Sequence, residues 1–117
     1  MILAITGGTG FVGSHLVNAA LAAGHTVKAL TWRDQPARDR LEWVAGSLEE
    51  RESVRRLVTD ADAVIHVAGV INAPDAARFD QANVAGTLAM LAAATAVGVH
   101  RFVHISSLAA REPGLAL

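Results

Sequence analysis

The feature of this chain that most constrains its fold is a glycine-rich turn that joins an apolar strand to a helix. The strand is expected over Ile2–Thr6 and the helix over Phe11–Ala23, with glycines between and within them at Gly7, Gly10 and Gly13. This spacing allows a tight turn, close approach of a ligand to the backbone, and close packing of helix on strand. The free amides and positive dipole end of the helix favour a phosphate. The turn therefore predicts a dinucleotide site, and the alternative is a connector without a ligand.

Composition restricts the class of protein. The chain has 117 residues, 52% of them hydrophobic and 18% charged, as expected for one compact domain. Its net charge is −1 and Lys28 is its only lysine, so we expect neither nucleic acid nor a membrane surface as partner. Cysteine is absent and the five histidines lack metal-ligand spacing, so no metal site is expected. The absence of cysteine and of a recognisable secretory signal favours a cytoplasmic location.

Short apolar segments alternate with helical ones along the chain. This alternation predicts an α/β fold, a doubly wound parallel sheet (Rossmann-like) of five strands in the order 3-2-1-4-5. Helices are expected over Phe11–Ala23, over Leu48–Thr59 and within Ala76–Val97. Strands buried on both faces are expected over Ile2–Thr6, Thr26–Thr31, Leu41–Ala45, Ala63–Ala68 and Arg101–Ser106.

Local signals mark the ends of these helices. Gly24 is placed to end the first helix. Ser47 and Glu50 have capping-box spacing, so Ser47 is expected to cap the second helix. The last helix contains no charged residue from Val84 to Val97. A helix that is apolar or small all round either needs a partner beyond the sheet, such as another copy of the chain, or exposes a small-residue face.

Five motifs follow one another along nearly the whole chain. They are the turn Thr6–Gly13, Gly-Ser-Leu at 46–48, His-Val-Ala-Gly at 66–69, Asn-Val-Ala-Gly-Thr at 83–87, and the strand Arg101–Ser107 with its terminal serine pair. In this order they resemble the extended short-chain dehydrogenases/reductases, the NAD(P)-dependent epimerase/dehydratase group. The resemblance implies a nicotinamide dinucleotide bound at the first three motifs. It also implies a homodimer paired through the helix at 84–97.

The resemblance assigns one catalytic residue and a set of cofactor-binding residues. Ser107 stands where the family has its catalytic serine, although serine is also common where a strand ends in a turn. Ser47 replaces the family's usual Asp, and its hydroxyl can still hydrogen-bond adenine. The expected cofactor-binding residues are Gly7, Thr9, Gly10, Phe11, Val12, Gly13, Thr31, Trp32, Arg33, Ser47, Leu48, Val67, Ala68 and Gly69.

The end of the second strand indicates which cofactor is preferred. An acidic residue there bonds the 2′-hydroxyl of NAD, whereas an arginine accepts the 2′-phosphate of NADP. Thr31 stands where an NAD-preferring relative carries Asp, and Arg33 follows closely, so NADP is favoured and NAD is the alternative. The alternative for Arg33 is an ion pair with Asp34 in solvent. Trp32 could lie over the adenine with its flat apolar face, and its alternative is to pack on the protein surface.

The family's downstream Tyr-x-x-x-Lys cannot be built here, because the chain has no tyrosine and its only lysine lies in the second strand. Residues 1–117 are therefore interpreted as the dinucleotide-binding domain of an oxidoreductase, epimerase or dehydratase, ending before the catalytic pair and the substrate region. The expected substrate is a small hydroxyl or carbonyl compound, with a nucleotide sugar as one form. The alternatives are a non-catalytic NADP-binding sensor or structural module, and a scaffold with a vestigial nucleotide site.

Overall fold

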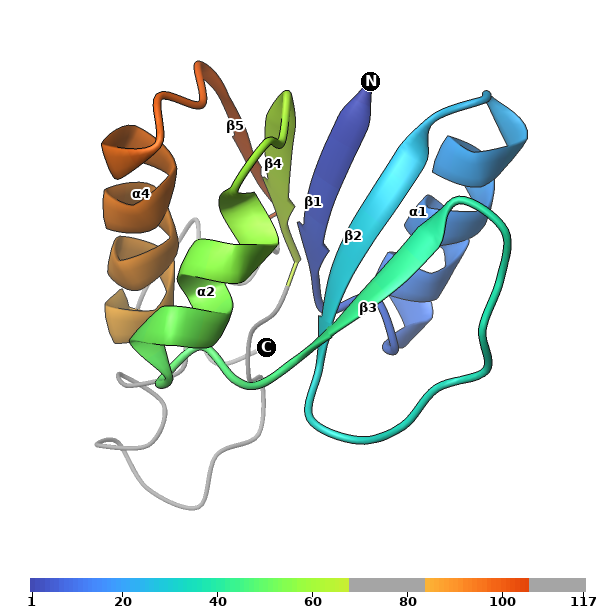
Figure 1. Ribbon diagram of the computed structural model, residues 1–117, viewed down its shortest axis with the longest axis horizontal. Helices are drawn as coiled ribbons and strands as arrows, with labels where there is room; N and C mark the ends of the chain where they lie inside the picture. The colour runs from blue at the N-terminus through green and yellow to red at the C-terminus, as the bar shows by residue number, and fades with distance from the viewer. Residues whose placement is uncertain (68–83, 106–117) are drawn as a thin grey trace, which may run out of the picture.

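The computed structural model describes residues 1–67 and 84–105. Five parallel strands form one sheet in the order β3-β2-β1-β4-β5, with helices on both faces (Figure 1). The predicted α/β fold and strand order are confirmed. The elements are β1 (Ile2–Thr6), α1 (Phe11–Ala22), β2 (Thr26–Thr31), β3 (Leu41–Ala45), α2 (Arg51–Val58), β4 (Ala63–His66), α4 (Gly86–Ala96) and β5 (Arg101–His104).

Two hydrophobic clusters hold the helices on the sheet. α1 packs on one face, where Val17 and Leu21 join buried side chains of β1 and β2. α2 and α4 cover the opposite face (Figure 1). Leu57 of α2 and Met90 of α4 are fully buried there. Removing this apolar surface from water is the main favourable term that fixes the layers. The carboxyl ends of β1, β2, β3 and β4 are thereby held together at one edge of the sheet.

The second helix begins later than its capping-box spacing predicted. α2 starts at Arg51, not Leu48, and no side chain caps its start. The hydroxyl of Ser53 instead lies 2.9 Å and 2.8 Å from the carbonyl oxygens of Ser47 and Glu50. It also accepts the Ser47 amide at 3.2 Å. A hydroxyl from inside the helix thus holds the turn that Ser47 was expected to cap.

The end of α1 agrees with prediction to within one residue. Gly24 has a φ of 92°, a value that favours glycine, and its amide donates to the carbonyl of Leu21 at 3.1 Å. Two strands are shorter than expected at their carboxyl ends. β4 ends at His66 and β5 ends at His104. The last predicted residues of these strands, Ala68 and Ser106, lie outside the described residues.

The expectation that every strand is buried on both faces is wrong for the two outermost strands. In β3, Glu42 and Ala45 are exposed, and in β5 only Phe102 is partly buried. β1 and β4 are largely buried, as predicted. The difference follows from position, because within the described part of the chain β3 and β5 each have a neighbouring strand on one side only.

The chain's only lysine has a structural role. The ammonium group of Lys28 donates to the carbonyls of Arg56 and Thr59, the latter at 2.9 Å, at the C-terminal end of α2. A cation there also meets the negative end of the helix dipole.

None of the helices in 1–67 and 84–105 is long and apolar enough to cross a membrane. Over the same residues, no three His, Asp or Glu side chains are grouped so that they could hold a metal ion.

Candidate functional site

A cleft of about 450 Å³ lies at the carboxyl edge of the sheet. Four segments line it: the turn after β1, the end of β2, the turn after β3 and the start of α4. Doubly wound sheets bind ligands at this edge, where strand ends and helix N-termini meet. The lining residues are Gly7, Thr9, Leu30, Thr31, Trp32, Gly46, Ser47, Leu48, Glu49, Ala85, Gly86 and Ala89.

Two glycines make the turn after β1 compact. Gly7 has a φ of 71°, and its carbonyl accepts the amide of Gly10 at 3.1 Å. Gly13 is buried, and a Cβ there would lie 1.8 Å from the carbonyl oxygen of Gly7. The fold itself therefore requires glycine at both positions, the first for its φ and the second for close packing.

Gly10 differs from these two. It is the N-cap residue of α1, with a φ of −83°, and an added Cβ would meet the carbonyl oxygen of Gly7 at 3.5 Å, an ordinary contact. No side chain of the described residues caps this helix. The first amides of a helix have no partner within it, and here they face a position without a side chain. The start of α1 can therefore accept an anionic group such as a phosphate.

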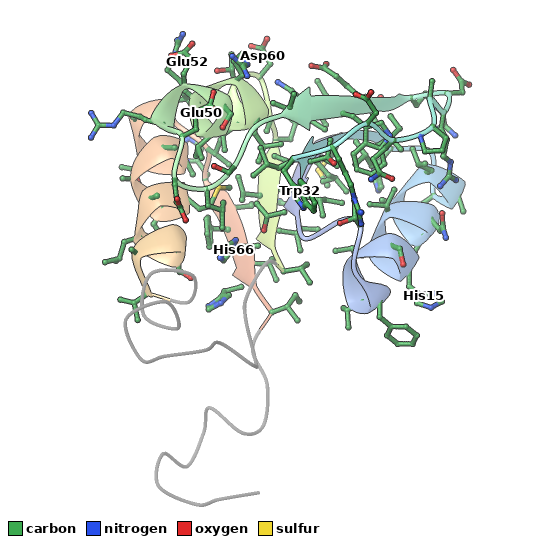
Figure 2. All side chains as sticks on the ribbon, turned by 90° about the horizontal axis from the view of Figure 1, so that it is seen from below. His15, Trp32, Glu50, Glu52, Asp60 and His66 are labelled. Carbon is green, nitrogen blue, oxygen red and sulfur yellow. The ribbon has the colours of Figure 1, made fainter. Side chains whose placement is uncertain are left out.

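The end of β2 forms a second wall. The Thr31 hydroxyl donates to the carbonyl of Arg33 at 2.7 Å and accepts the Arg33 amide at 3.3 Å. Trp32 follows β2 directly (Figure 2) and is 75% exposed. The Arg33 guanidinium lies 4.8 Å from the centroid of its ring. The alternative ion pair of Arg33 with Asp34 is not formed, because the one ion pair within the described ranges joins Arg55 to Glu52.

The turn after β3 forms a third wall. Gly46 has a φ of 149°, and a Cβ there would lie 2.1 Å from the Cβ of Ser53, so α2 packs directly on this turn. Ser47 and Leu48, two of the residues expected to bind the cofactor, line the cleft. Glu49 lines it as well and adds a carboxylate.

His66 lies at the end of β4 and is fully buried (Figure 2). Its Nδ1 is 2.7 Å from the Thr6 hydroxyl, and its Nε2 is 3.1 Å from the Thr87 hydroxyl. Burial lowers the pKa of His66 from 6.5 to about 4, and the charge of His104 acts in the same direction. The ring centroids of the two histidines are 5.3 Å apart. His66 is therefore neutral at neutral pH. Its predicted burial is confirmed, whereas that of His104 is wrong, because His104 is exposed on an edge strand.

The predicted cofactor residues fall into three groups. Those that line the cleft are Gly7, Thr9, Thr31, Trp32, Ser47 and Leu48. Those that are described but do not line it are Gly10, Phe11, Val12 and Gly13 at the start of α1, Arg33 after Trp32, and Val67 after β4. Those outside the described residues are Ala68 and Gly69, together with the predicted catalytic Ser107.

Sequence reasoning missed the wall formed by α4. Ala85, Gly86 and Ala89 line the cleft, although the charge-free stretch 84–97 was interpreted as either a protein interface or a helix with an exposed small-residue face. Small side chains at the start of a helix also let a ligand approach, and this pattern could have indicated that α4 lines the cleft. Glu49 carried no signal beyond its position next to Leu48.

The whole chain can be compared with known proteins. Residues 3–114 match the model of the NAD dependent epimerase/dehydratase family. The chain belongs to this family, which confirms the resemblance drawn from its motifs.

Individual relatives agree with this assignment. The chain is 43% identical to the ceramide reductase of Caulobacter vibrioides, over 97% of this chain and 37% of the relative. A short-chain dehydrogenase/reductase superfamily protein of Agrobacterium tumefaciens, solved with NAD bound, has 37% identity and a TM-score of 0.80 over 92% of this chain and 33% of that one. The UDP-glucose 4-epimerase of Thermotoga maritima has 25% identity and a TM-score of 0.79, over 92% and 38%. The chain thus spans little more than a third of the length of these proteins.

Proposed function

We propose that this chain forms the NADP(H)-binding part of an oxidoreductase, epimerase or dehydratase that acts on a hydroxyl or carbonyl group of a small substrate. The observation that supports this most is the open start of α1, which has no side-chain cap and begins beside the cleft. Packing within the fold does not require glycine at Gly10, so close approach of a ligand is the better reason for it. Family membership identifies the ligand as a nicotinamide dinucleotide.

In this proposal the backbone holds the pyrophosphate. The amides of Phe11, Val12 and Gly13 open α1 and donate to its oxygens, with Gly7 and Thr9 forming the adjoining wall.

The adenosine half of the dinucleotide extends towards the ends of β2 and β3. The indole of Trp32 and the side chain of Leu48 offer apolar surface to the adenine, and the Ser47 hydroxyl offers a hydrogen bond. Val67, Ala68 and Gly69 are assigned to the nicotinamide ribose on their motif alone.

We assign Arg33 to the 2′-phosphate of NADP. The last residue of β2 is Thr31, which has no carboxylate for a 2′-hydroxyl and whose own hydroxyl is bonded to the backbone of Arg33. The Arg33 guanidinium rests on the exposed Trp32 ring, close to the cleft. A planar guanidinium suits a phosphate through two parallel hydrogen bonds. NAD is the alternative, since the Agrobacterium relative was solved with it.

The reacting groups belong to the protein beyond the described residues. Ser107 is proposed to hydrogen-bond the substrate oxygen, and a Tyr-x-x-x-Lys further along is proposed to move the proton. When bound, the nicotinamide supplies or accepts the hydride. Because the relatives include a ceramide reductase and a UDP-glucose 4-epimerase, the substrate is proposed only as a hydroxyl or carbonyl compound, nucleotide sugars included.

Titration of the full-length protein with NADPH and NADH, followed by cofactor fluorescence, tests the proposal. We expect NADPH to bind more tightly, and Arg33→Asp to weaken NADPH binding about tenfold while NADH binding is kept or improved. Arg38→Asp is the matched control, because Arg38 lies on the same loop but bonds Asn18 at 2.6 Å. Unchanged relative affinities remove Arg33 from the phosphate site, and absence of binding by the wild-type protein contradicts the proposed function.

Turnover separates the enzyme from a non-catalytic module. We expect hydroxyl or carbonyl compounds to change the nicotinamide absorbance with the full-length protein. Tight cofactor binding without turnover across such a panel favours the sensor or structural module. A cytoplasmic location and a homodimer through the helix at 84–97 are further proposals. For the dimer, Leu88 is 60% exposed on α4, and Leu88→Glu is expected to yield monomers in sedimentation.

A further inference from the structure

A buried histidine connects two walls of the cleft. His66 contacts the hydroxyl of Thr6, the residue directly before Gly7, and the hydroxyl of Thr87, the residue directly after Gly86. Gly7 and Gly86 both line the cleft, whereas His66 does not. The imidazole therefore spans from the glycine turn after β1 to the first turn of α4, behind the surface that a ligand touches.

The chemistry of these contacts fits a neutral imidazole. The Thr6 hydroxyl accepts the amide of Val67 at 3.1 Å, so its own proton can be donated to Nδ1 of His66. Nε2 then carries the ring proton and donates it to Thr87. From β5, His104 and the Phe102 ring, with centroids 5.3 Å and 6.4 Å away, also face the imidazole. No carboxylate bonds the imidazole in the described residues, so nothing there favours its charged form.

We infer that His66 is a positioning residue of the cofactor site, which sets the separation of the glycine turn from the α4 wall through its contacts with Thr6 and Thr87. This inference rests on the proposed function. Because His66 joins two elements far apart in the sequence, loss of one contact lets the first turn of α4 shift relative to β1. The cofactor, which lies between them, is then held less well although no residue that touches it has changed.

The test is NADPH binding by the full-length protein with Thr87→Val, which removes the hydroxyl at constant shape. We expect affinity to fall about three- to tenfold once the His66–Thr87 hydrogen bond is lost, and His66→Leu, below, tests that contact from the other side. Thr87→Ser keeps the hydroxyl and is expected to bind within about twofold of wild type. Thr95→Val is the matched control on the same helix, because the Thr95 hydroxyl donates only to its own helix, at the carbonyl of Leu91. All affinities are measured well below each variant's melting temperature, so that only folded protein is compared.

The outcomes separate this inference from the proposed function. A lower melting temperature for Thr87→Val with unchanged NADPH affinity overturns the inference alone, because the contact is then purely structural. Failure of the wild-type protein to bind NADPH overturns both. His66→Leu removes both contacts and is expected to weaken binding at least as much as Thr87→Val. An effect of His66→Leu no larger than that of Thr95→Val also contradicts the inference.

Discussion

The turns that follow β1 and β3 lie at the same edge of the sheet and both lead into a helix, yet they differ in how their polar groups are used. In the β3–α2 turn, one hydroxyl from Ser53 contacts the backbone of Ser47 and Glu50. In the β1–α1 turn, no side chain of residues 1–67 and 84–105 caps the helix, and Gly10 has no side chain to cover its first amides. The chain thus closes one turn with its own hydroxyl and leaves the start of the other helix without such a cap, where we propose that the pyrophosphate binds.

The same contrast exists between the glycines. Gly13 and Gly46 are needed by the fold, because a Cβ at either would lie within about 2 Å of atoms of the chain, at 1.8 Å and 2.1 Å. Gly10 is not, because among the described residues a Cβ there would meet only the carbonyl oxygen of Gly7, at an ordinary 3.5 Å. Gly10 and Gly13 therefore belong to one motif but are glycines for different reasons. Packing requires glycine at Gly13, whereas we propose that the approach of a ligand requires it at Gly10.

The largest effect is expected at Gly13. Gly13→Ala forces the backbone of α1 away from Gly7, and we expect the free energy of unfolding to fall by about 3 kcal/mol, as in overpacked cores. Urea denaturation measures this. A loss below about 1 kcal/mol would show that the turn can relax and that the contrast with Gly10 is weaker than the geometry indicates.

The closed turn gives the next effect. Ser53→Ala removes a buried hydroxyl with three contacts, and we expect a stability loss of about 2 kcal/mol. Ser14→Ala is the matched change in the open turn, where the hydroxyl makes one contact, with the carbonyl of Phe11 at 3.0 Å. It is expected to cost less than about 0.5 kcal/mol. Equal losses in urea denaturation would contradict the difference between the turns.

A smaller effect concerns pH, at the strand end beside the open turn. The unfolded chain takes up a proton at His66 below pH 6.5, whereas the folded chain does so only near pH 4. The folded state therefore loses stability as the pH falls from 6.5 to about 4, by roughly 1.4 kcal/mol for each pH unit from this residue.

Denaturation at several pH values detects this contribution. His66→Gln is expected to flatten the dependence between pH 6.5 and 4, while His100→Gln, a change of an exposed histidine, retains it. Identical slopes for His66→Gln and the wild-type protein would exclude His66 as the source.

Sequence predicted the fold well because the fold depends on patterns that repeat. The alternation of strand and helix segments predicted the order of the strands in the sheet. The spacing of Gly7, Gly10 and Gly13 predicted where α1 begins, next to the cleft. The start of α2 was missed because capping rules consider a short local window. They assigned the cap to Ser47, whereas the hydroxyl that holds the turn belongs to Ser53.

The rest of the site depends on residues that are distant in sequence. Nothing in the motif at 66–69 shows that His66 reaches both Thr6 and Thr87, since that requires the register of β1 against β4 and the position of α4. The α4 wall of the cleft was unpredicted for the same reason. The exposure of β3 and β5 follows from strand order, so it is known only once the sheet is assembled.

The most direct test of the account is NADPH binding by full-length Gly10→Ala. The account predicts that the free energy of unfolding falls by no more than about 1 kcal/mol, the ordinary cost of alanine at an N-cap, because the backbone and space at this position accept a Cβ. It predicts at the same time that NADPH binds about tenfold or more weakly, because the methyl group covers the amides that hold the pyrophosphate. Unchanged NADPH affinity in a folded Gly10→Ala protein would contradict the claim that the start of α1 is the phosphate site.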